Sequence, residues 1–312
     1  MKTARVVLLA LLLPWLELRP RAAEPVLPLR TNDVIAFIGG ANMVALAQSG
    51  HLETLLTLKH PHHKLRFRSL AWEGDTVFAQ PRDVNYPNLV TQLKQVGATV
   101  AFVQFGQMES LAGEAGLTNF VTAYEALLDR CKGACSRFVL LRPDSSRTLL
   151  DGRYGSRITP REKDLIRYAE AIVGIAGRQQ GCAKLLYEDV LHDGDANKLP
   201  PETESEPPGA GRIFDETDYL RLFSTVFGKD SKYPMSSAIA EKNRLWFDYA
   251  RPSNWAFLAG DRTEQAFSRD YRDRNIRAFA QEMQQFLPLI ADAEKRIDEL
   301  AAKAAEEKET TR

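Results

Sequence analysis

Three short turns of the sequence combine glycine with residues that can donate or accept hydrogen bonds. They are Gly39-Gly40-Ala41-Asn42, Trp72-Glu73-Gly74-Asp75 and Gly106-Gln107-Met108-Glu109-Ser110, and each follows a segment with a strand-like pattern. In an open α/β sheet, ligands bind outside the carboxyl ends of the strands, at the point where the strand order reverses. We therefore expect any functional site to be built from these turns.

Two of the turns carry carboxylates. Glu73, Asp75 and Glu109 could form a pair for acid–base chemistry, or they could bind a cation. A structural interpretation is at least as good, with Glu109 hydrogen-bonded within its turn and Asp75 exposed to solvent. The sequence leaves both interpretations open.

Nucleophilic chemistry has only fallback candidates, Ser110 and His192. Ser110 and Asn42 are near the expected pocket mouth but have no obvious neighbouring base, and a serine without one is a poor nucleophile. His192 follows the fifth predicted strand, in a segment whose composition favours a solvated loop. The cluster His60-Pro61-His62-His63 precedes the second predicted strand, at the opposite edge of the sheet. We expect a surface turn there and no metal site.

Short apolar runs alternate with longer helical periods and predict the elements that position the turns. The predicted strands are Val34–Ile38, Leu65–Leu70, Thr99–Phe105, Arg137–Leu141 and Lys184–Val190. The predicted helices are Met43–Lys59, Leu89–Val96, Thr118–Arg130 and Pro160–Arg178, and the chain after residue 211 is expected to be helical. The first and third strands contain runs that are apolar on both faces, as strands between two helix layers must be.

The second predicted strand has a different pattern. Leu65-Arg66-Phe67-Arg68-Ser69-Leu70 alternates, which places two arginines on one face and indicates a position at the edge of the sheet. An outermost second strand is typical of the flavodoxin-like order 2-1-3-4-5. We therefore predict an α/β fold: a flavodoxin-like three-layer α/β/α domain with a five-stranded parallel sheet and a helical C-terminal extension.

The sequence resembles the SGNH (GDSL-type) esterase and lipase family from Asp33 to about Leu300. The resemblance rests on the three turns and on the longer segments 67–77, 109–117, 242–247 and 251–254, which look like a divergent bacterial branch of that family. It implies acyl transfer, in which a serine attacks an ester carbonyl and a histidine, oriented by an aspartate three residues earlier, takes the proton. It also implies an oxyanion hole made of two backbone N–H groups and an asparagine side chain.

Most of that catalytic pattern is missing from this chain. Ala41 stands at the nucleophile position, Met108 at the asparagine position and Phe214 at the histidine position. The remnants of the pocket and oxyanion hole that the resemblance implies are Gly39, Gly40, Asn42, Gly74, Asp75, Gly106 and Glu109. No catalytic residue is assigned with the family's usual role.

The N-terminal segment has the outline of a secretory signal. Lys2 and Arg5 precede an apolar run, Val6–Leu13, that is about half the roughly 20 residues needed to span a bilayer. We expect residues 1–23 to be the signal peptide of an exported protein, periplasmic or extracellular, with an uncleaved N-terminal anchor as the alternative.

The rest of the chain is expected to form one domain with an extension. We expect a linker at 24–32 and the α/β domain at 33–230, with a mobile loop at 199–211. A helical extension at 231–312 is expected to pack on the domain, with a disordered tail from about residue 305.

The composition argues against some partners. The 41 Lys and Arg residues balance the 41 Asp and Glu residues, and no basic stripe with interleaved aromatics is present, so we do not expect nucleic acid as a partner. Cys131, Cys135 and Cys182 are too few for a disulfide scaffold, and a Cys131–Cys135 bond and three buried thiols remain equally good interpretations. We expect no cofactor and no bound metal.

Three hypotheses of function follow. The leading one is a catalytically degenerate member of the family, a pseudoenzyme that binds a glycan, a small ester-like ligand or a protein partner. The alternative is an active carboxylic-ester hydrolase, acetyl-esterase-like, that uses non-standard residues. A scaffold role would require an exposed apolar face on the C-terminal helices. Aromatic residues such as Trp72, Tyr86 and Trp246 could line a ligand groove or could be ordinary packing.

Overall fold

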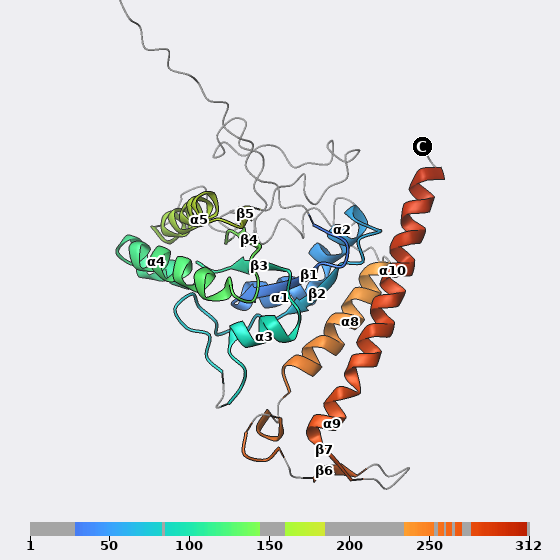
Figure 1. Ribbon diagram of the computed structural model, residues 1–312. Coiled ribbons are helices and arrows are strands. Elements are labelled where there is room, and N and C mark those ends of the chain that lie inside the picture. The colour runs from blue at the N-terminus through green and yellow to red at the C-terminus, as the bar shows by residue number, and fades with distance from the viewer. Residues whose placement is uncertain are drawn as a thin grey trace, which may run out of the picture.

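A five-stranded parallel sheet forms the centre of the protein (Figure 1). The computed structural model describes residues 29–82, 85–143, 160–184, 234–252, 255–258, 260–263, 266–269 and 276–310. The strand order is β2-β1-β3-β4-β5, which confirms the predicted fold class. The strands are β1 (Val34–Gly39), β2 (Arg66–Ser69), β3 (Val100–Gln104), β4 (Phe138–Leu141) and β5 (Cys182–Lys184).

Helices cover both faces of this sheet. Successive side chains of a strand point to opposite faces, so Phe37 of β1 packs against α1 and α2, whereas Ile38 packs into the core beneath α3, α4 and α5. These two apolar layers explain why the central strands have no polar face. The helices are α1 (Ala41–Ser49), α2 (His51–Lys59), α3 (Leu89–Gln95), α4 (Gly113–Cys131) and α5 (Pro160–Arg178), with a short 3-10 helix η1 (Glu109–Ala112) before α4.

The predicted helix Met43–Lys59 is two helices in the structure. Gly50, with a φ of 66°, separates α1 from α2. A Cβ at this position would lie 2.6 Å from Ile239 Cγ2, so the glycine also makes room for the helix that crosses here. The break was not predicted because the apolar spacing continues through it.

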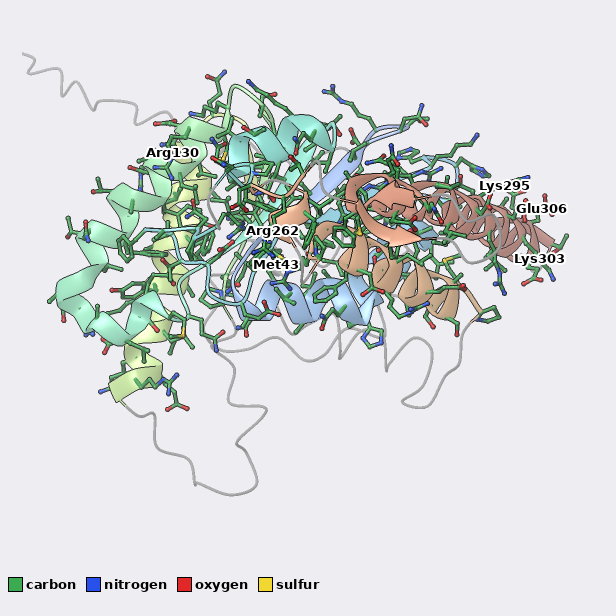
Figure 2. All side chains as sticks on the ribbon, turned by 90° about the horizontal axis from the view of Figure 1, so that it is seen from below. Met43, Arg130, Arg262, Lys295, Lys303 and Glu306 are labelled. Carbon is green, nitrogen blue, oxygen red and sulfur yellow. The ribbon has the colours of Figure 1, made fainter. Side chains whose placement is uncertain are left out.

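A helical extension packs along the edge of the sheet. Helices α8 (Pro234–Ala250) and α10 (Phe286–Thr310) lie side by side next to β2 and α2 (Figure 1). The part of α10 that carries Lys295, Lys303 and Glu306 lies at one end of the molecule, opposite Arg130 of α4 (Figure 2). The extension also contains η4 (Trp255–Phe257), β6 (Ala266–Arg269), β7 (Ile276–Ala278) and α9 (Phe279–Gln284).

The arginines of the edge strand β2 bind this extension. Arg66 donates two hydrogen bonds to Asp298, at 3.0 and 2.7 Å, and Arg68 donates one to Glu294 at 2.5 Å. The edge position predicted from the alternating pattern is confirmed. Two charged side chains are tolerated on this strand because α10 supplies a carboxylate for each of them.

A buried ion pair fixes α8 to α2. Lys242 Nζ lies 2.8 Å from Glu53 Oε1, and both side chains are almost fully buried. Burial raises the pKa of Glu53 and lowers that of Lys242, and the attraction between the two groups opposes both shifts. Asn243 donates to Glu53 Oε2 at 3.2 Å and to the Ala47 carbonyl at 2.8 Å, which completes the network.

Several element boundaries differ from the predictions. The antiparallel hairpin β6–β7 lies within the extension, which the sequence predicted to be helical throughout. Helix α10 continues to Thr310, beyond the residue near 305 where a disordered tail was expected, because its last turns are rich in strong helix formers and Ala301 is buried against α8. Helix α4 begins at Gly113 rather than Thr118, and β5 begins at Cys182.

Some expectations fall on residues outside the described part of the chain. These are the signal peptide at 1–23, most of the linker, the loop at 199–211, and residues 185–190 of the fifth predicted strand. Among the described residues, no helix has the length and apolar character needed to cross a membrane, and no cluster of potential metal ligands occurs. Cys131, Cys135 and Cys182 are buried free thiols.

Candidate functional site

A cavity of about 130 Å³ opens at the carboxyl edge of the sheet, where the strand order reverses between β1 and β3. It lies between the first turn of α1 and the turn that follows β3. The first two predicted turns therefore meet the third here, as expected for an open α/β sheet. The described lining residues are Gly40, Ala41, Asn42, Asp75, Gln104, Phe105, Gln107, Met108, Glu109 and Arg161.

Two glycines allow the backbone segments around the cavity to approach closely. Gly39 pairs with Gln104 in the β1–β3 register, and a Cβ on Gly39 would collide with the Gln104 carbonyl oxygen. A Cβ on Gly40 would lie 2.9 Å from the Asp75 carbonyl oxygen. The two positions singled out in the sequence are thus sites of close backbone approach, which requires glycine.

Glu109 connects two of the turns. Its carboxylate is buried and accepts hydrogen bonds from Val77 N at 2.7 Å and from Gly106 N at 2.8 Å. Both carboxylate oxygens are thereby held by backbone donors, one from the loop after β2 and one from the loop after β3. Of the two interpretations left open by the sequence, the geometry favours the structural one, in which this carboxylate holds the loops together.

Asp75 is paired with an arginine. Its two oxygens accept hydrogen bonds from Arg82, at 2.6 and 2.8 Å, and the carboxylate is buried, not exposed as the structural interpretation expected. Burial raises the pKa of Asp75, and the contacts with Arg82 oppose the shift. Asp75 therefore lines the cavity with its charge already compensated.

Trp72 links the loop that follows β2 to the C-terminal extension. The guanidinium groups of Arg82 and Arg251 lie 4.5 and 4.6 Å from the centre of its ring, and Arg251 also forms an ion pair with Glu73. Tyr86 packs edge-on against Trp72, and its hydroxyl donates to the Ala250 carbonyl at 2.7 Å. These aromatic residues join the site loop to α8, so packing is the role that the geometry gives them.

The remaining predicted residues do not form a catalytic group. Ser110 is buried, does not line the cavity, and donates through Oγ to the Gln107 carbonyl at 2.8 Å. Met108 lies on the rim with 59% of its surface exposed. Ala41 and Asn42 line the cavity, whereas Gly74 is exposed and does not.

No imidazole is placed at this cavity by the described residues. His60, His62 and His63 precede β2, at the opposite edge of the sheet, and His51 begins α2. Phe214 and His192 lie outside the described residues. Within the described lining there is no serine, threonine, cysteine or histidine side chain, and therefore none of the usual nucleophile–base pairs.

Two glutamines of the cavity lining were not predicted from the sequence as site residues. Gln104, the last residue of β3, is only 2% exposed, and its Nε2 has no hydrogen-bond partner among the described residues. Gln107 Oε1 is likewise buried without a partner there. An unsatisfied buried polar group costs about 1–3 kcal/mol, so two of them in one small cavity require an explanation. The available signal was a polar residue at the carboxyl end of an otherwise apolar strand.

A second, larger cavity of about 720 Å³ lies between the sheet edge and the extension. Its lining includes Arg68, which is paired with Glu294, and Trp246, whose Nε1 donates to the Ser69 carbonyl at 2.9 Å. None of its lining residues has a buried side-chain polar atom without a partner within the described segments. It therefore contrasts with the smaller cavity, in which such atoms occur.

Comparisons with known proteins give only distant structural likeness. No protein-family model and no curated protein matches the sequence. Axe2, an acetylxylan esterase from Geobacillus stearothermophilus, is similar with a TM-score of 0.34 and 15% identity, covering 47% of this chain and 73% of that one. LAE5, an alpha/beta hydrolase from the metagenome of Lake Arreo, Spain, gives 0.33 and 14%, with 48% and 74% covered.

A third similar structure is that of a gut microbial diltiazem-metabolizing enzyme. Its TM-score is 0.38 and its identity 16%, with 50% of this chain covered. The match spans little more than a third of that enzyme, 37% of its chain. At these values the similarity concerns the coarse arrangement of strands and helices.

Proposed function

We propose that this protein is a catalytically degenerate relative of the SGNH hydrolases that binds a small ligand at the carboxyl edge of the sheet without hydrolysing an ester. One observation carries the proposal. The described lining of the cavity offers no hydroxyl, thiol or imidazole, while it offers two amide side chains, each with a buried atom that has no hydrogen-bond partner among the described residues. Such a lining supports recognition of polar groups and lacks the activated nucleophile that acyl transfer needs.

The carboxylates of the cavity support the same conclusion. Each oxygen of Glu109 already accepts from a backbone N–H group, and each oxygen of Asp75 accepts from Arg82. A carboxylate oxygen can accept more than one hydrogen bond, but both carboxylates are already held in place by other partners, which argues against either of them as a general base. Redirecting either carboxylate would break hydrogen bonds that hold the loops of the site together.

The size of the cavity favours a ligand that inserts one small group. At about 130 Å³ it is below the roughly 300–1,000 Å³ typical of pockets that enclose a whole small molecule. One substituent of a glycan or of an ester-like ligand would enter, and the rest would lie outside. A protein partner would have to insert a single side chain.

An ester-hydrolysis assay tests the absence of turnover. The purified full-length protein is incubated with a panel of acetyl and short acyl esters, beside the variants Ala41→Ser and Ala45→Ser. Ala45 is an exposed alanine on the same helix and controls for adding a hydroxyl to α1. We expect no turnover above the buffer rate from any of the three proteins, because a hydroxyl at position 41 would still have no base among the described residues.

Activity in the unmodified protein that a serine-directed inhibitor abolishes would overturn the proposal and favour an active esterase. Activity gained by Ala41→Ser, and not by Ala45→Ser, would show that a general base lies within reach of position 41, which contradicts the proposal that this base is missing.

We also propose that the protein is exported, on the strength of the N-terminal pattern of Lys2, Arg5 and the apolar run that follows. Fractionation of cells that express the full chain tests this, and recovery in the cytoplasm would contradict it.

A further inference from the structure

The unsatisfied amide of Gln104 defines what the cavity can recognise. This side chain is 98% buried, lines the cavity, and carries an Nε2 group with no acceptor among the described residues. Gln107, three residues later, adds a second buried amide atom without a partner there. The oxygen and nitrogen of an amide exchange places on a half-turn of the side chain, so Gln107 can present a donor as well as an acceptor.

Two sources of positive potential lie at the cavity. The cavity includes the first turn of α1, a nine-residue helix with no side-chain cap and no acidic residue in that turn. The backbone N–H groups at a helix N-terminus and the helix dipole attract anions. Arg161, an exposed residue in the first turn of α5, also lines the cavity.

The two carboxylates that line the cavity already have hydrogen-bond partners within the fold. Glu109 accepts two backbone hydrogen bonds, and Asp75 is paired with Arg82. Each of their oxygens already accepts a hydrogen bond, whereas Gln104 Nε2 has no acceptor among the described residues. An acceptor that carries negative charge complements this arrangement, because charge-assisted hydrogen bonds are stronger than neutral ones.

We propose that the cavity binds the carboxylate group of a small ligand. The carboxylate accepts from Gln104 Nε2, from the Gln107 amide and from the N-terminus of α1, and Arg161 lies beside it at the mouth. This inference rests on the proposed function, since an enzyme that hydrolysed esters here would release a carboxylate instead of retaining one. The volume of about 130 Å³ equals that of about four water molecules at roughly 30 Å³ each, which is enough for a carboxylate and one adjoining group.

Binding of acetate tests the proposal. The line width of isotope-labelled acetate is measured with increasing full-length protein at constant ionic strength, and unlabelled acetate, acetamide and inorganic phosphate are used as competitors. Acetamide is a neutral molecule of nearly the same shape as acetate. We expect saturable binding of acetate and at least about tenfold weaker binding of acetamide, as for a lost charge-assisted interaction.

Two matched pairs of variants locate the site. Gln104→Leu removes the buried amide, and we expect it to weaken acetate binding by about tenfold or more. Gln48→Leu, at an exposed glutamine near the other end of α1, should bind acetate as the unmodified protein does. Arg161→Gln should weaken binding by about twofold to fivefold, and Arg178→Gln, at the other end of α5, should have no effect.

The stability of Gln104→Leu separates a ligand-binding role from a structural one. Without ligand, the free energy of unfolding of this variant should be unchanged or higher, because the leucine removes a donor that the fold leaves unsatisfied. A marked loss of stability would assign Gln104 to the fold and overturn the proposal. Arg161 is on the surface, so its variant tests the site even if Gln104→Leu does not fold.

Three other results would overturn the carboxylate assignment: no saturable binding of acetate, equal binding of acetate and acetamide, or tighter binding of inorganic phosphate than of acetate. These failures are distinguishable from failure of the proposed function. If neutral acetylated sugars bind at the cavity while acetate does not, the carboxylate proposal fails and the non-hydrolytic function stands. If esters are hydrolysed, the proposed function itself fails.

Discussion

The two polar regions of this protein differ in how completely their polar groups are paired. At the interface between the sheet edge and the C-terminal extension, Glu53 is paired with Lys242, and Arg66 and Arg68 are paired with carboxylates of α10. At the carboxyl edge of the sheet, Gln104 and Gln107 keep unsatisfied buried atoms within the described structure. Complete pairing is what a permanent interface between parts of one chain requires, and incomplete pairing leaves capacity for a ligand.

The largest expected loss of stability follows from breaking the buried ion pair that fixes the extension to α2. Lys242→Met leaves the Glu53 carboxylate buried without its cation, and we expect a loss of about 3–5 kcal/mol in the free energy of unfolding, measured with urea. Lys303→Met, at an exposed lysine of α10, is the control and should change stability little. The double variant Glu53→Leu with Lys242→Met should recover most of the loss. If Lys242→Met and Lys303→Met lose equal stability, the interface does not depend on this pair.

The second prediction concerns the paired carboxylate of the site itself. Glu109→Gln puts an amide N–H group opposite one of two backbone donors, and we expect a loss of about 2 kcal/mol, the worth of a hydrogen bond to a charged group. Urea unfolding measures it, with Glu114→Gln on the exposed surface of α4 as the control. Unchanged stability would mean that Glu109 is available for chemistry, and it would weaken the contrast between the two regions.

A third prediction follows from the raised pKa of Asp75. The folded protein holds the proton of this carboxyl to a higher pH than the unfolded chain does, so its contribution to stability is full below 3.8 and is lost as the pH rises through the folded-state pKa. The difference in unfolding free energy between the unmodified protein and Asp75→Asn should therefore fall by about 1.4 kcal/mol for each pH unit between the two pKa values.

Urea titrations at pH values on both sides of 3.8 measure this difference. Asp261→Asn, at an exposed aspartate, should show no such decline. A difference that rises with pH in the same window would mean that the Arg82 contacts outweigh the burial of Asp75.

The smallest expected loss of stability follows from breaking the pair of Arg66 with Asp298, whose side chains are 24% and 25% exposed. We expect Asp298→Asn to lose roughly 0.5–1 kcal/mol, and the loss should shrink in high salt because solvent and ions screen the pair. Glu299→Gln, the next residue of α10 and exposed, is the control in the same unfolding experiment. A loss as large as that of Lys242→Met would show that exposure does not distinguish the two ion pairs.

The sequence predicted the sheet because its strands differ in pattern. Runs that are apolar on both faces identified the central strands, and the alternation through Arg66 and Arg68 identified the edge strand. The break at Gly50 could not be read in the same way, since the need for it comes from Ile239, almost 190 residues later in the chain. The hairpin β6–β7 was missed because the helical spacing on both sides of it dominates the pattern of the extension.

The sequence predicted where the three turns meet, but not what each side chain does there. The three turns meet as expected, because parallel strands bring their carboxyl ends to one edge. The roles of Glu109 and Asp75 depended on partners in other loops, Val77 N and Arg82, which no local pattern reveals. Gln104 lies within the predicted strand Thr99–Phe105, and the sequence alone does not show that its amide nitrogen has no partner among the described residues.

The distance along the chain between β2 and α10 has a consequence for synthesis. Arg68 binds a carboxylate 226 positions later, so the ribosome must produce more than two thirds of the chain before this edge strand receives its cover. At roughly 5–20 residues per second, the interval lasts on the order of ten seconds or more. An uncovered strand edge invites pairing with other nascent chains, and charged side chains discourage it. We therefore expect the two arginines of β2, Arg66 and Arg68, to discourage such pairing in the unfinished chain before they bind α10.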